Sequence, residues 1–506
     1  MKKSKKIVGA VATVAVFGVF TRLIGFLFKI YLSRALGAEA LGLYQIALSV
    51  FFLFSSLSSS GVAQIISRKT AECNAIGSKN VPSLFGSALF ICTTTSLSIA
   101  IVLMIFKDNL TFLFSNVAAH PLFLIMIPAL ISTSISGIIR GWLWGGKQFT
   151  AFSATETVEE SLRILVSVFF LCGVIGALQG VYAIAYAFTV SDIIAVIVLL
   201  IIFFCKGGKI SKPSEIKSVL VPSLPITAMH VCSSLISTLV AFILPLRLIS
   251  FGFEGSEATA AFGRIAGMAN PLLFAPNAII GSLCVVLIPE LSANMIKQNY
   301  CTLNKQLTLG INFSFIISGL FIAVYSSLGV EITKFLYHDL QSGQYLQIAT
   351  FSMLPLCLSQ LTQSALNSIG KEYQGFVNYL TGNIIMLSFI YVLPKLIGIY
   401  SVAAASFICS TVISLMNYFS LKKATCLKSD FLKYAVLTLL FTFPSAFVGE
   451  CVNSLFEPII GTYSFLPAGA ICCLVYGTLC IITNVLDIKG IIMQRFSLGK
   501  RKKALI

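Results

Sequence analysis

The sequence predicts an all-α integral membrane protein with fourteen transmembrane helices, arranged as two pseudo-symmetric six-helix lobes followed by two C-terminal helices. The first observation behind this prediction is composition: 57% of the 506 residues are hydrophobic and only 10% are charged. A soluble domain carries about 25% charged residues, and the mean hydropathy of this chain is +0.95. So few charges could not cover the surface of a soluble protein of this size, so lipid must be the main solvent.

The second observation is a series of apolar runs, each close to the roughly 20 residues that a helix needs to cross a bilayer. Glycine, proline and charged clusters separate them. The runs cover residues 7–33, 42–66, 83–106, 122–143, 160–178, 181–204, 219–245, 261–289, 307–330, 346–367, 374–397, 400–421, 431–449 and 463–486. The narrow breaks at Gln179-Gly180 and Gly398-Ile399 decide the count, because merging the runs at both positions would remove two helices.

The third observation is the distribution of positive charge. Lys and Arg total 35 against 18 Asp and Glu, for a net charge of +17. The basic residues lie mostly in short loops, and cytoplasmic loops of membrane proteins carry such an excess. With the amino terminus inside, the outward-facing basic residues are Arg34, Lys107, Arg247, Lys334 and Lys395. Both termini are therefore expected in the cytoplasm, and the basic loops favour contacts with membrane lipids over nucleic acid.

The sequence lacks the residue clusters of metal sites and enzymes. Its 14 cysteines are scattered through apolar runs with no C-x-x-C pair, as is typical of small hydrophobic residues. The three histidines, His120, His230 and His338, stand far apart. No nucleophile triad is visible, and the segment Lys206-Gly207-Gly208-Lys209 lacks the Walker spacing. We therefore expect a transporter rather than an enzyme, without cofactors.

Two pairs of similar segments, about 220 residues apart, suggest an internal repeat. Gly42-Leu43-Tyr44-Gln45-Ile46-Ala47 opens the second apolar run, and Ala261-Phe262-Gly263-Arg264-Ile265-Ala266 opens the eighth. Gly146-Lys147-Gln148-Phe149 follows the fourth run, and Gly370-Lys371-Glu372-Tyr373 follows the tenth. Both members of each pair begin on the same side of the membrane, which indicates a parallel repeat.

This repeat predicts three parts of the chain. Residues 1–215 would form an N-lobe of six helices, residues 216–422 a C-lobe of six helices, and residues 423–506 the last two helices with a basic cytoplasmic tail. Lobed duplications of this kind bind substrate between the lobes and work by alternating access.

Cations inside apolar runs are candidate functional residues, because an ionisable side chain near mid-bilayer costs about 2.5 to 3.5 kcal/mol on insertion scales. Arg22 and Lys29 are seven residues apart, so they share one helical face. Arg264 opens the eighth run. The alternative for Lys29 is snorkelling to the outer interface, and the alternative for Arg22 and Arg264 is a purely structural pair between the lobes.

The eighth run also carries amides and prolines. Asn270 and Asn277 share a face, while Pro271 and Pro276 should break the helix and free backbone carbonyls. Such a broken helix suits a cavity wall, so Asn270 joins the candidate substrate-binding residues.

Other polar residues allow two interpretations each. Asp192 is the only carboxylate near the middle of a predicted helix, and it either couples protons or sodium or pairs with a buried cation. Arg163 and Glu159 are expected to form a solvated helix-end ion pair. His230 is either a proton relay or a core histidine. The stripe Gln360, Gln363 and Asn367 either lines a passage or joins neighbouring helices.

Taken together, the apolar runs hold mostly positive charge. This balance favours an anionic substrate over a cationic drug, because arginine binds phosphate bidentately and stays charged at any physiological pH.

The segment Thr21-Arg22-Leu23-Ile24-Gly25-Phe26, continued by Leu32-Ser33-Arg34-Ala35-Leu36-Gly37 and Gly42-Leu43-Tyr44-Gln45, resembles the stage V sporulation protein B family. The resemblance spans nearly the whole chain, including the Gly-Lys loops and Leu287-Ile288-Pro289-Glu290-Leu291-Ser292. That family is a polysaccharide-transport branch of the multidrug/oligosaccharidyl-lipid/polysaccharide (MOP) exporter superfamily. The MurJ lipid II flippases are a more distant resemblance. Both imply the fold of the MOP superfamily, which includes the multidrug exporters called MATE.

The resemblance to MurJ implies that Arg22 and Arg264 bind a lipid-linked diphosphate sugar, because the corresponding arginines have that role in those flippases. Two departures limit the transfer of mechanism. Phe28-Lys29 stands where MurJ-type flippases tend to have Arg-Asp, and the run 374–397 contains Asn378 and Asn383 but no carboxylate. A sodium site built from carboxylates is therefore not expected there, while Lys29 adds positive charge.

The sequence thus predicts a flippase of the bacterial cell membrane that moves an undecaprenyl-diphosphate-linked saccharide, with lipid II as the favoured substrate, from the inner to the outer leaflet. Arg22, Lys29, Arg264 and Asn270 would bind it. The expected partners are this lipid-linked anionic saccharide, membrane lipids, a coupling ion (H⁺ or Na⁺) and cell-wall synthesis machinery, in peptidoglycan synthesis or sporulation. The alternatives are a cation-coupled multidrug antiporter of the MATE type and a non-transporting scaffold for wall or spore assembly.

Overall fold

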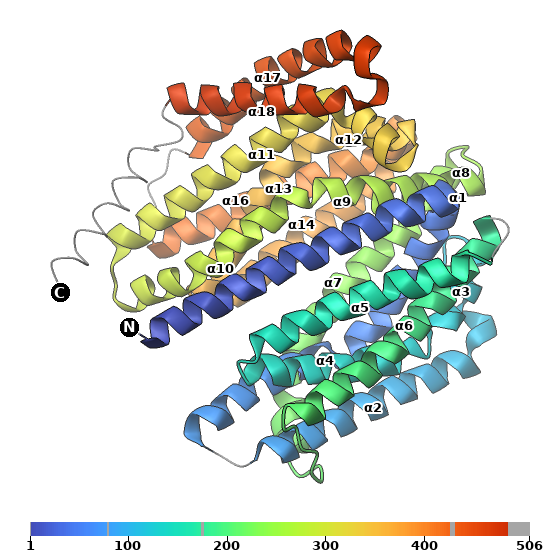
Figure 1. Ribbon diagram of the computed structural model, residues 1–506, viewed down its shortest axis with the longest axis vertical. Coiled ribbons are helices and arrows are strands. Elements are labelled where there is room, and N and C mark those ends of the chain that lie inside the picture. The colour runs from blue at the N-terminus through green and yellow to red at the C-terminus, as the bar shows by residue number, and fades with distance from the viewer. Residues whose placement is uncertain (1, 78–79, 174–176, 426–430, 484–506) are drawn as a thin grey trace. The chain divides into compact units, whose positions relative to one another are not determined.

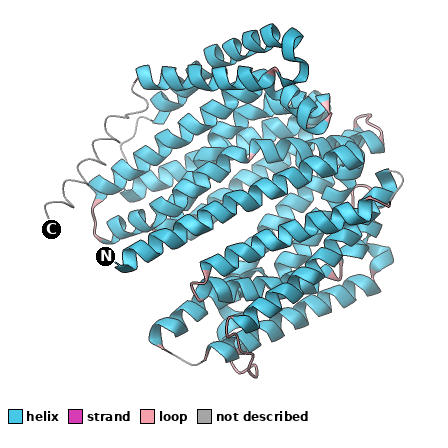
Figure 2. Ribbon diagram, in the orientation of Figure 1, coloured by secondary structure: helices cyan, strands magenta, loops and turns pink. Residues whose placement is uncertain are grey.

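The computed structural model describes residues 2–77, 80–173, 177–425 and 431–483. These residues are almost entirely helical, and no strand occurs among them (Figure 2). The predicted basic tail lies outside the described residues, since residues 484–506 are not among them. The all-helical class is therefore confirmed for the described part of the chain.

The chain forms two compact units, Met1–Met268 with Leu387–Gly398 and Ala269–Met386 with Ile399–Ile506. The helices of the first unit, labelled in Figure 1, are α1 (Lys2–Ile76), α2 (Val81–Ile105), α3 (His120–Met126), α4 (Ala129–Gly145), α5 (Phe149–Leu171), α6 (Ala177–Cys205), α7 (Ile216–Ser250), α8 (Gly255–Gly263) and the short α15 (Pro394–Ile397).

The second unit holds the remaining helices. They are α9 (Asn270–Leu273), α10 (Ala275–Ile296), α11 (Tyr300–Tyr337), α12 (Leu340–Ala349), α13 (Met353–Ser368), most of α14 (Glu372–Val392), α16 (Ser401–Thr425), α17 (Phe431–Ile460) and α18 (Phe465–Ile482). The first unit thus includes α7, which the predicted division at residue 216 assigns to the second lobe. That division remains a prediction.

Nine helices of the described residues are long and apolar enough to cross a membrane, and α3 with α4, bent by 53°, would make a tenth. The chain is therefore a multi-pass membrane protein, while the count of fourteen remains a prediction. The longest candidate covers 60 residues of α1, roughly 90 Å of helix, about three times the hydrocarbon thickness. Gly37, with φ 78° and ψ 177°, breaks α1 between the two runs expected there.

The eighth run is interrupted, as its prolines predict. Helix α8 continues into a π-helical turn, Arg264–Ala269, and then into the four-residue α9. A new helix, α10, begins at Ala275. Proline has no N–H to donate and its ring clashes with the preceding turn, so Pro271 and Pro276 each take an early position of a new helix.

Each unit has its own apolar core. In the first unit Ile66 of α1, Phe85 of α2 and Phe203 of α6 are at most 1% exposed and belong to one cluster. In the second unit Phe315 of α11 and Leu358 of α13 are also at most 1% exposed and belong to another cluster. Side chains from helices far apart in the sequence therefore fix how the helices of each unit pack, and this packing positions the polar residues described next.

Candidate functional site: a charged network on α1, α4, α5 and α6

The substrate-binding cations predicted on α1 face α5. The hydroxyl oxygens of Thr21 on α1 and Thr157 on α5 lie 2.8 Å apart and share a hydrogen bond. One α-helical turn later, a Cβ placed on Gly25 would lie 2.9 Å from the Oε1 oxygen of Glu160. Both pairings advance in the same direction, so the two segments run parallel, and a glycine lets the carboxylate approach the α1 backbone.

Arg22 and Lys29 flank this contact on the same face of α1. Arg22 is exposed and interacts electrostatically with Glu156 of α5. Lys29 is partly buried and interacts electrostatically with Glu160. Each candidate cation of α1 therefore has a carboxylate of α5 within electrostatic range.

Behind this contact, Arg163 of α5 binds three carboxylates. Its Nη1 donates to Glu160 Oε2 at 2.9 Å, and its Nη2 donates to Glu159 Oε1 and to Asp192 Oδ1, both at 3.1 Å. The side chain of Arg163 is 19% exposed and that of Asp192 on α6 only 3%. The expectation of a solvated helix-end pair for Arg163 and Glu159 is therefore wrong, because the pair is part of a largely buried network.

The network extends to α4 and to the α1 segment that follows Gly37. Arg140 of α4 forms an ion pair with Glu159. The guanidinium of Arg163 lies 5.1 Å from the ring centroid of Phe188 on α6, a cation–π distance. Tyr44, only 4% exposed, lies near Arg163. The tyrosine of the Gly-Leu-Tyr-Gln motif therefore lies beside this network.

Sequence reasoning began the expected run at residue 160, with Glu159 at the solvated helix end and Glu156 outside the run, and so missed both as part of the interior. Helix α5 begins at Phe149, eleven residues before the expected run. The first half of α5 contains many polar residues and so has low hydropathy. It can nevertheless lie in the interior, because its charged side chains pair with other charges. One signal was present: Glu156, Glu160 and Arg163 follow an i, i+4, i+7 spacing, which places them on one helical face.

The charge balance of this region also differs from the expectation of a mostly positive interior. The network and its α1 neighbours contain four acids, Glu156, Glu159, Glu160 and Asp192, and four bases, Arg22, Lys29, Arg140 and Arg163. Their formal charges cancel. An anionic ligand at Arg22 and Lys29 would therefore meet neighbouring carboxylates as well as cations.

Arg264 lies beside another part of α1. Helices α1 and α8 approach closely through glycines: a Cβ on Gly42 would overlap the carbonyl oxygen of Thr259, and a Cβ on Gly263 would overlap that of Ala38. Small residues at such crossings let helix backbones come into contact. Arg264, the residue after Gly263, is therefore held near Ala38, just past the break at Gly37.

The structure brings Arg22 and Lys29 together but not Arg22 and Arg264. Fifteen residues of helix separate Arg22 from Gly37, roughly 22 Å along the axis. The two arginines are therefore too far apart in this conformation to contact one small anion. Asn270 is partly buried and begins α9, in the second unit.

The structure also shows the surroundings of two other polar residues that had two interpretations, His230 and Gln363. His230 is exposed rather than in a core, and its Nε2 lies 2.9 Å from Gln64 Nε2. In the second unit, Asn417 of α16 donates to Gln363 Oε1 at 3.2 Å and accepts from Asn378 of α14 at 2.9 Å. Gln363 therefore joins helices, as one of its two interpretations predicts.

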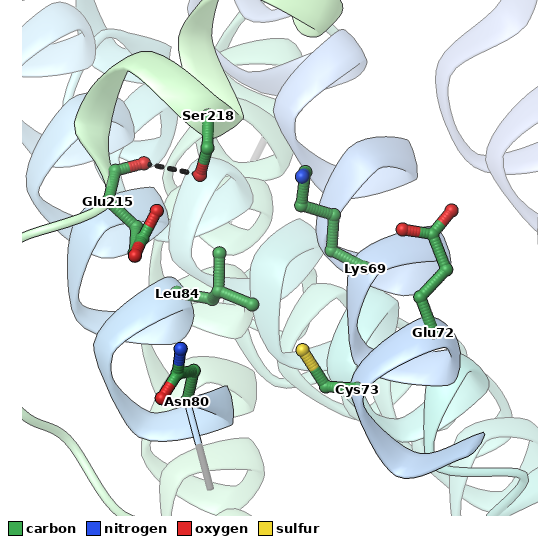
Figure 3. A pocket seen from close by; sticks show the side chains of 7 residues that line it. All are labelled: Lys69, Glu72, Cys73, Asn80, Leu84, Glu215 and Ser218. Atoms are coloured by element: carbon green, nitrogen blue, oxygen red, sulfur yellow. Dashed lines mark hydrogen bonds between the residues drawn. The ribbon is translucent and has the colours of Figure 1, made fainter. Parts of the chain in front are cut away.

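A pocket of about 160 Å³ lies at the far end of α1 in the first unit (Figure 3). Figure 3 shows side chains from the end of α1, the start of α2 and the start of α7 around it: Lys69, Glu72, Cys73, Asn80, Leu84, Glu215 and Ser218. Its lining mixes both charges, and none of these seven residues is a predicted substrate-binding residue.

Comparison with known proteins places the chain in a family. Residues 8–295, more than half of the chain, match the family described as polysaccharide biosynthesis protein. The chain belongs to this family. Stage V sporulation protein B of Bacillus subtilis (strain 168) is 24% identical over 439 residues, which are 83% of this chain and 84% of that protein. Sporulation protein YkvU of the same strain is 24% identical over 413 residues, 77% of this chain and 89% of that protein.

Solved structures share the fold of this family member. Lipid II flippase MurJ in an inward closed conformation matches with a TM-score of 0.75 and 16% identity, over 94% of this chain and 99% of that one. A MATE family multidrug resistance transporter of the MOP superfamily, in an inward-facing conformation, matches with a TM-score of 0.69 and 15% identity, over 81% of this chain and 96% of that one. The expected resemblance to stage V sporulation protein B and to the MOP fold is confirmed.

Proposed function

We propose that this protein is a flippase that moves an undecaprenyl-diphosphate-linked saccharide from the inner to the outer leaflet of a bacterial cell membrane by alternating access. Lipid II, the peptidoglycan precursor, is the substrate we favour. The observation that carries the proposal is the pair Arg22 and Lys29 on one face of α1, in a chain of the polysaccharide biosynthesis family. Arginine binds phosphate oxygens bidentately, and a lysine adds a second cation.

In this proposal the cations of α1 hold the diphosphate, and Arg264 holds a further anionic group of the head group. Asn270 contributes hydrogen bonds to the head group. The lipid tail stays in the bilayer beside a lateral opening. An inside-negative membrane potential favours outward movement of an anion by about 2.3 kcal/mol per charge per 100 mV, so transport needs no nucleotide. We place both termini in the cytoplasm, where wall-synthesis enzymes could deliver the substrate.

A genetic experiment tests this function. A bacterial strain depleted of its lipid II flippase would express the wild type, Arg22→Ala, Arg264→Ala or Arg68→Ala at matched membrane levels. Arg68 is a control from the same helix, exposed and paired with Glu72 in an i,i+4 ion pair. We expect growth with the wild type and Arg68→Ala but not with the other two variants. Failure of a well-expressed wild type would exclude lipid II as the substrate.

A cation-coupled multidrug antiporter is the second candidate, because Glu159, Glu160 and Asp192 do lie within the helical bundle of the first unit. Such an antiporter exchanges a cationic drug for protons or sodium at embedded carboxylates. All three carboxylates bind Arg163, which opposes this use. The same strains decide the matter: drug resistance without growth rescue would favour the antiporter.

Asp192 is our candidate for ion coupling in either mechanism. Its Oδ1 accepts from Arg163, while its buried Oδ2 has no hydrogen-bond partner among the described residues. A carboxylate with one open oxygen could take up a proton or a sodium ion without giving up its arginine.

A further inference from the structure

We propose that Glu156 and Glu160 of α5 are built-in counter-anions that occupy the cationic face of α1, and that the anionic head group of the substrate displaces them and releases α1 from α5. The proposal rests on the proposed function for the identity of the ligand. The structural part of the proposal, that α5 restrains α1, rests on contacts within the first unit.

The two oxygens of Glu160 face different partners. Oε2 accepts from Arg163 within α5, at 2.9 Å. Oε1 points at the α1 backbone beside Gly25, where a Cβ would lie 2.9 Å away. Glu160 therefore reaches across to α1 in addition to its bond within α5, and Lys29, four residues after Gly25, lies within electrostatic range of it.

Charge balance makes coexistence of ligand and counter-anion unfavourable. The four acids and four bases already cancel, so a diphosphate bound at Arg22 and Lys29 would leave an excess of negative charge in a partly buried site. Like charges a few ångströms apart repel strongly where the dielectric constant is low. The head group therefore has to compete with Glu156 and Glu160 for the same two cations.

Displacement would free α1 to move. The described hydrogen bond from this face of α1 to α5 joins Thr21 and Thr157. Gly37 breaks the helix, and a Cβ built there would meet no atom within 4 Å among the described residues. Gly37 is therefore the point at which the preceding segment of α1 can change its direction, since the helix is already broken there. Substrate binding and movement of α1 would then be a single event, as alternating access requires.

Cross-linking between α1 and α5 measures directly how firmly α5 restrains α1. In a background with the natural cysteines replaced, Thr21→Cys and Thr157→Cys would be combined, and the rate of cross-linking in membranes would be measured with and without undecaprenyl diphosphate. We expect the ligand to slow cross-linking in the wild-type background. Glu160→Gln should slow it without ligand by about two- to fivefold, the size of a partly exposed charge–charge interaction. Glu72→Gln, which changes an exposed carboxylate near the end of α1, is the control and should change nothing.

Affinity separates the counter-anion from a merely structural carboxylate. Glu160→Gln should bind undecaprenyl diphosphate about two- to fivefold more tightly, because it removes the competitor. Lys29→Gln should slow cross-linking similarly but bind the ligand more weakly, because it removes the cation. Weaker binding by both variants, or unchanged cross-linking in Glu160→Gln, would overturn the proposal. Absence of binding to the wild type would instead contradict the proposed function, while ligand-free cross-linking would still decide whether Glu160 holds α1.

Discussion

Arg163 and Asp192 form an ion pair between α5 and α6, with Arg163 Nη2 3.1 Å from Asp192 Oδ1. The two helices lie side by side (Figure 1). Because the carboxylate is only 3% exposed, solvent cannot replace the arginine if it is removed. Glu159 and Glu160 bind the same guanidinium, so one side chain contacts three carboxylates of the first unit.

Arg163→Ala should therefore destabilise the protein strongly. Removing one partner of a buried pair typically costs about 3 kcal/mol or more, since the other charge stays buried and uncompensated. Thermal unfolding of the purified protein in detergent would measure the loss. The double variant Arg163→Ala/Asp192→Asn should lose less than the sum of the two single variants. Arg68→Ala, which removes an exposed i,i+4 pair, should stay close to the wild type. An equal effect of Arg163→Ala and Arg68→Ala would show that the network does not stabilise the fold.

Gly42→Ala should disrupt the packing of α1 against α8. The new methyl group would overlap the carbonyl oxygen of Thr259, a backbone atom that cannot rotate away. Overpacking of this kind costs about 1 to 3 kcal/mol. Gly18→Ala is the matched control on the same helix, where a Cβ would meet no atom within 4 Å among the described residues. The melting temperatures of the two variants give the comparison. Equal melting temperatures would contradict the close crossing.

Asn417→Ala should loosen the second unit. Asn417 is fully buried and joins Asn378 of α14 to Gln363 of α13. Its removal leaves both amides without this partner, at a cost of about 1 to 3 kcal/mol for a buried polar group. Thr411→Ala on the same helix serves for comparison, because the exposed Thr411 hydroxyl donates only to Phe407 of its own helix. In urea or heat unfolding, Asn417→Ala should be much less stable than Thr411→Ala, and the reverse order of stability would refute the amide network.

Asp192→Asn tests ion coupling. If the free oxygen of Asp192 takes up an ion, transport by this variant should no longer respond to an imposed proton or sodium gradient, while its response to membrane potential persists. Uptake into proteoliposomes with each gradient applied alone separates the two driving forces. A gradient response equal to that of the wild type would leave Asp192 as a partner of Arg163 only. Asparagine keeps an acceptor for Arg163, so the fold should tolerate the change better than Arg163→Ala.

Sequence reasoning predicted the parts of this fold that depend on apolar runs and backbone chemistry. Composition alone indicated a multi-pass helical membrane protein. Gly37 separates the first two expected runs, and its left-handed φ angle breaks α1. Pro271 and Pro276 predicted an interrupted helix, and α9 and α10 each begin just before one of them.

The charged interior could not be predicted in the same way, because its residues stabilise each other only across helices. The sequence around Glu156 and Glu159 is rich in polar residues, and its hydropathy is too low to be recognised as part of a membrane-spanning run. The compensating charges of Arg140 and Arg22 come from α4 and α1. Likewise, the alternative of a structural pair between Arg22 and Arg264 does not hold in this conformation, because the contact of Gly263 with Ala38 keeps Arg264 near the other end of that α1 segment.

The most direct measurement is the movement of a fluorescent lipid II analogue between leaflets of liposomes containing the purified protein. With a membrane-impermeant quencher, we expect the wild type and Arg68→Ala to exchange the analogue faster than protein-free liposomes. Arg22→Ala should be no faster than those liposomes. Exchange by the wild type at the protein-free rate would contradict the proposed flippase, and equal exchange by Arg22→Ala and the wild type would contradict the cationic face of α1 as its substrate site.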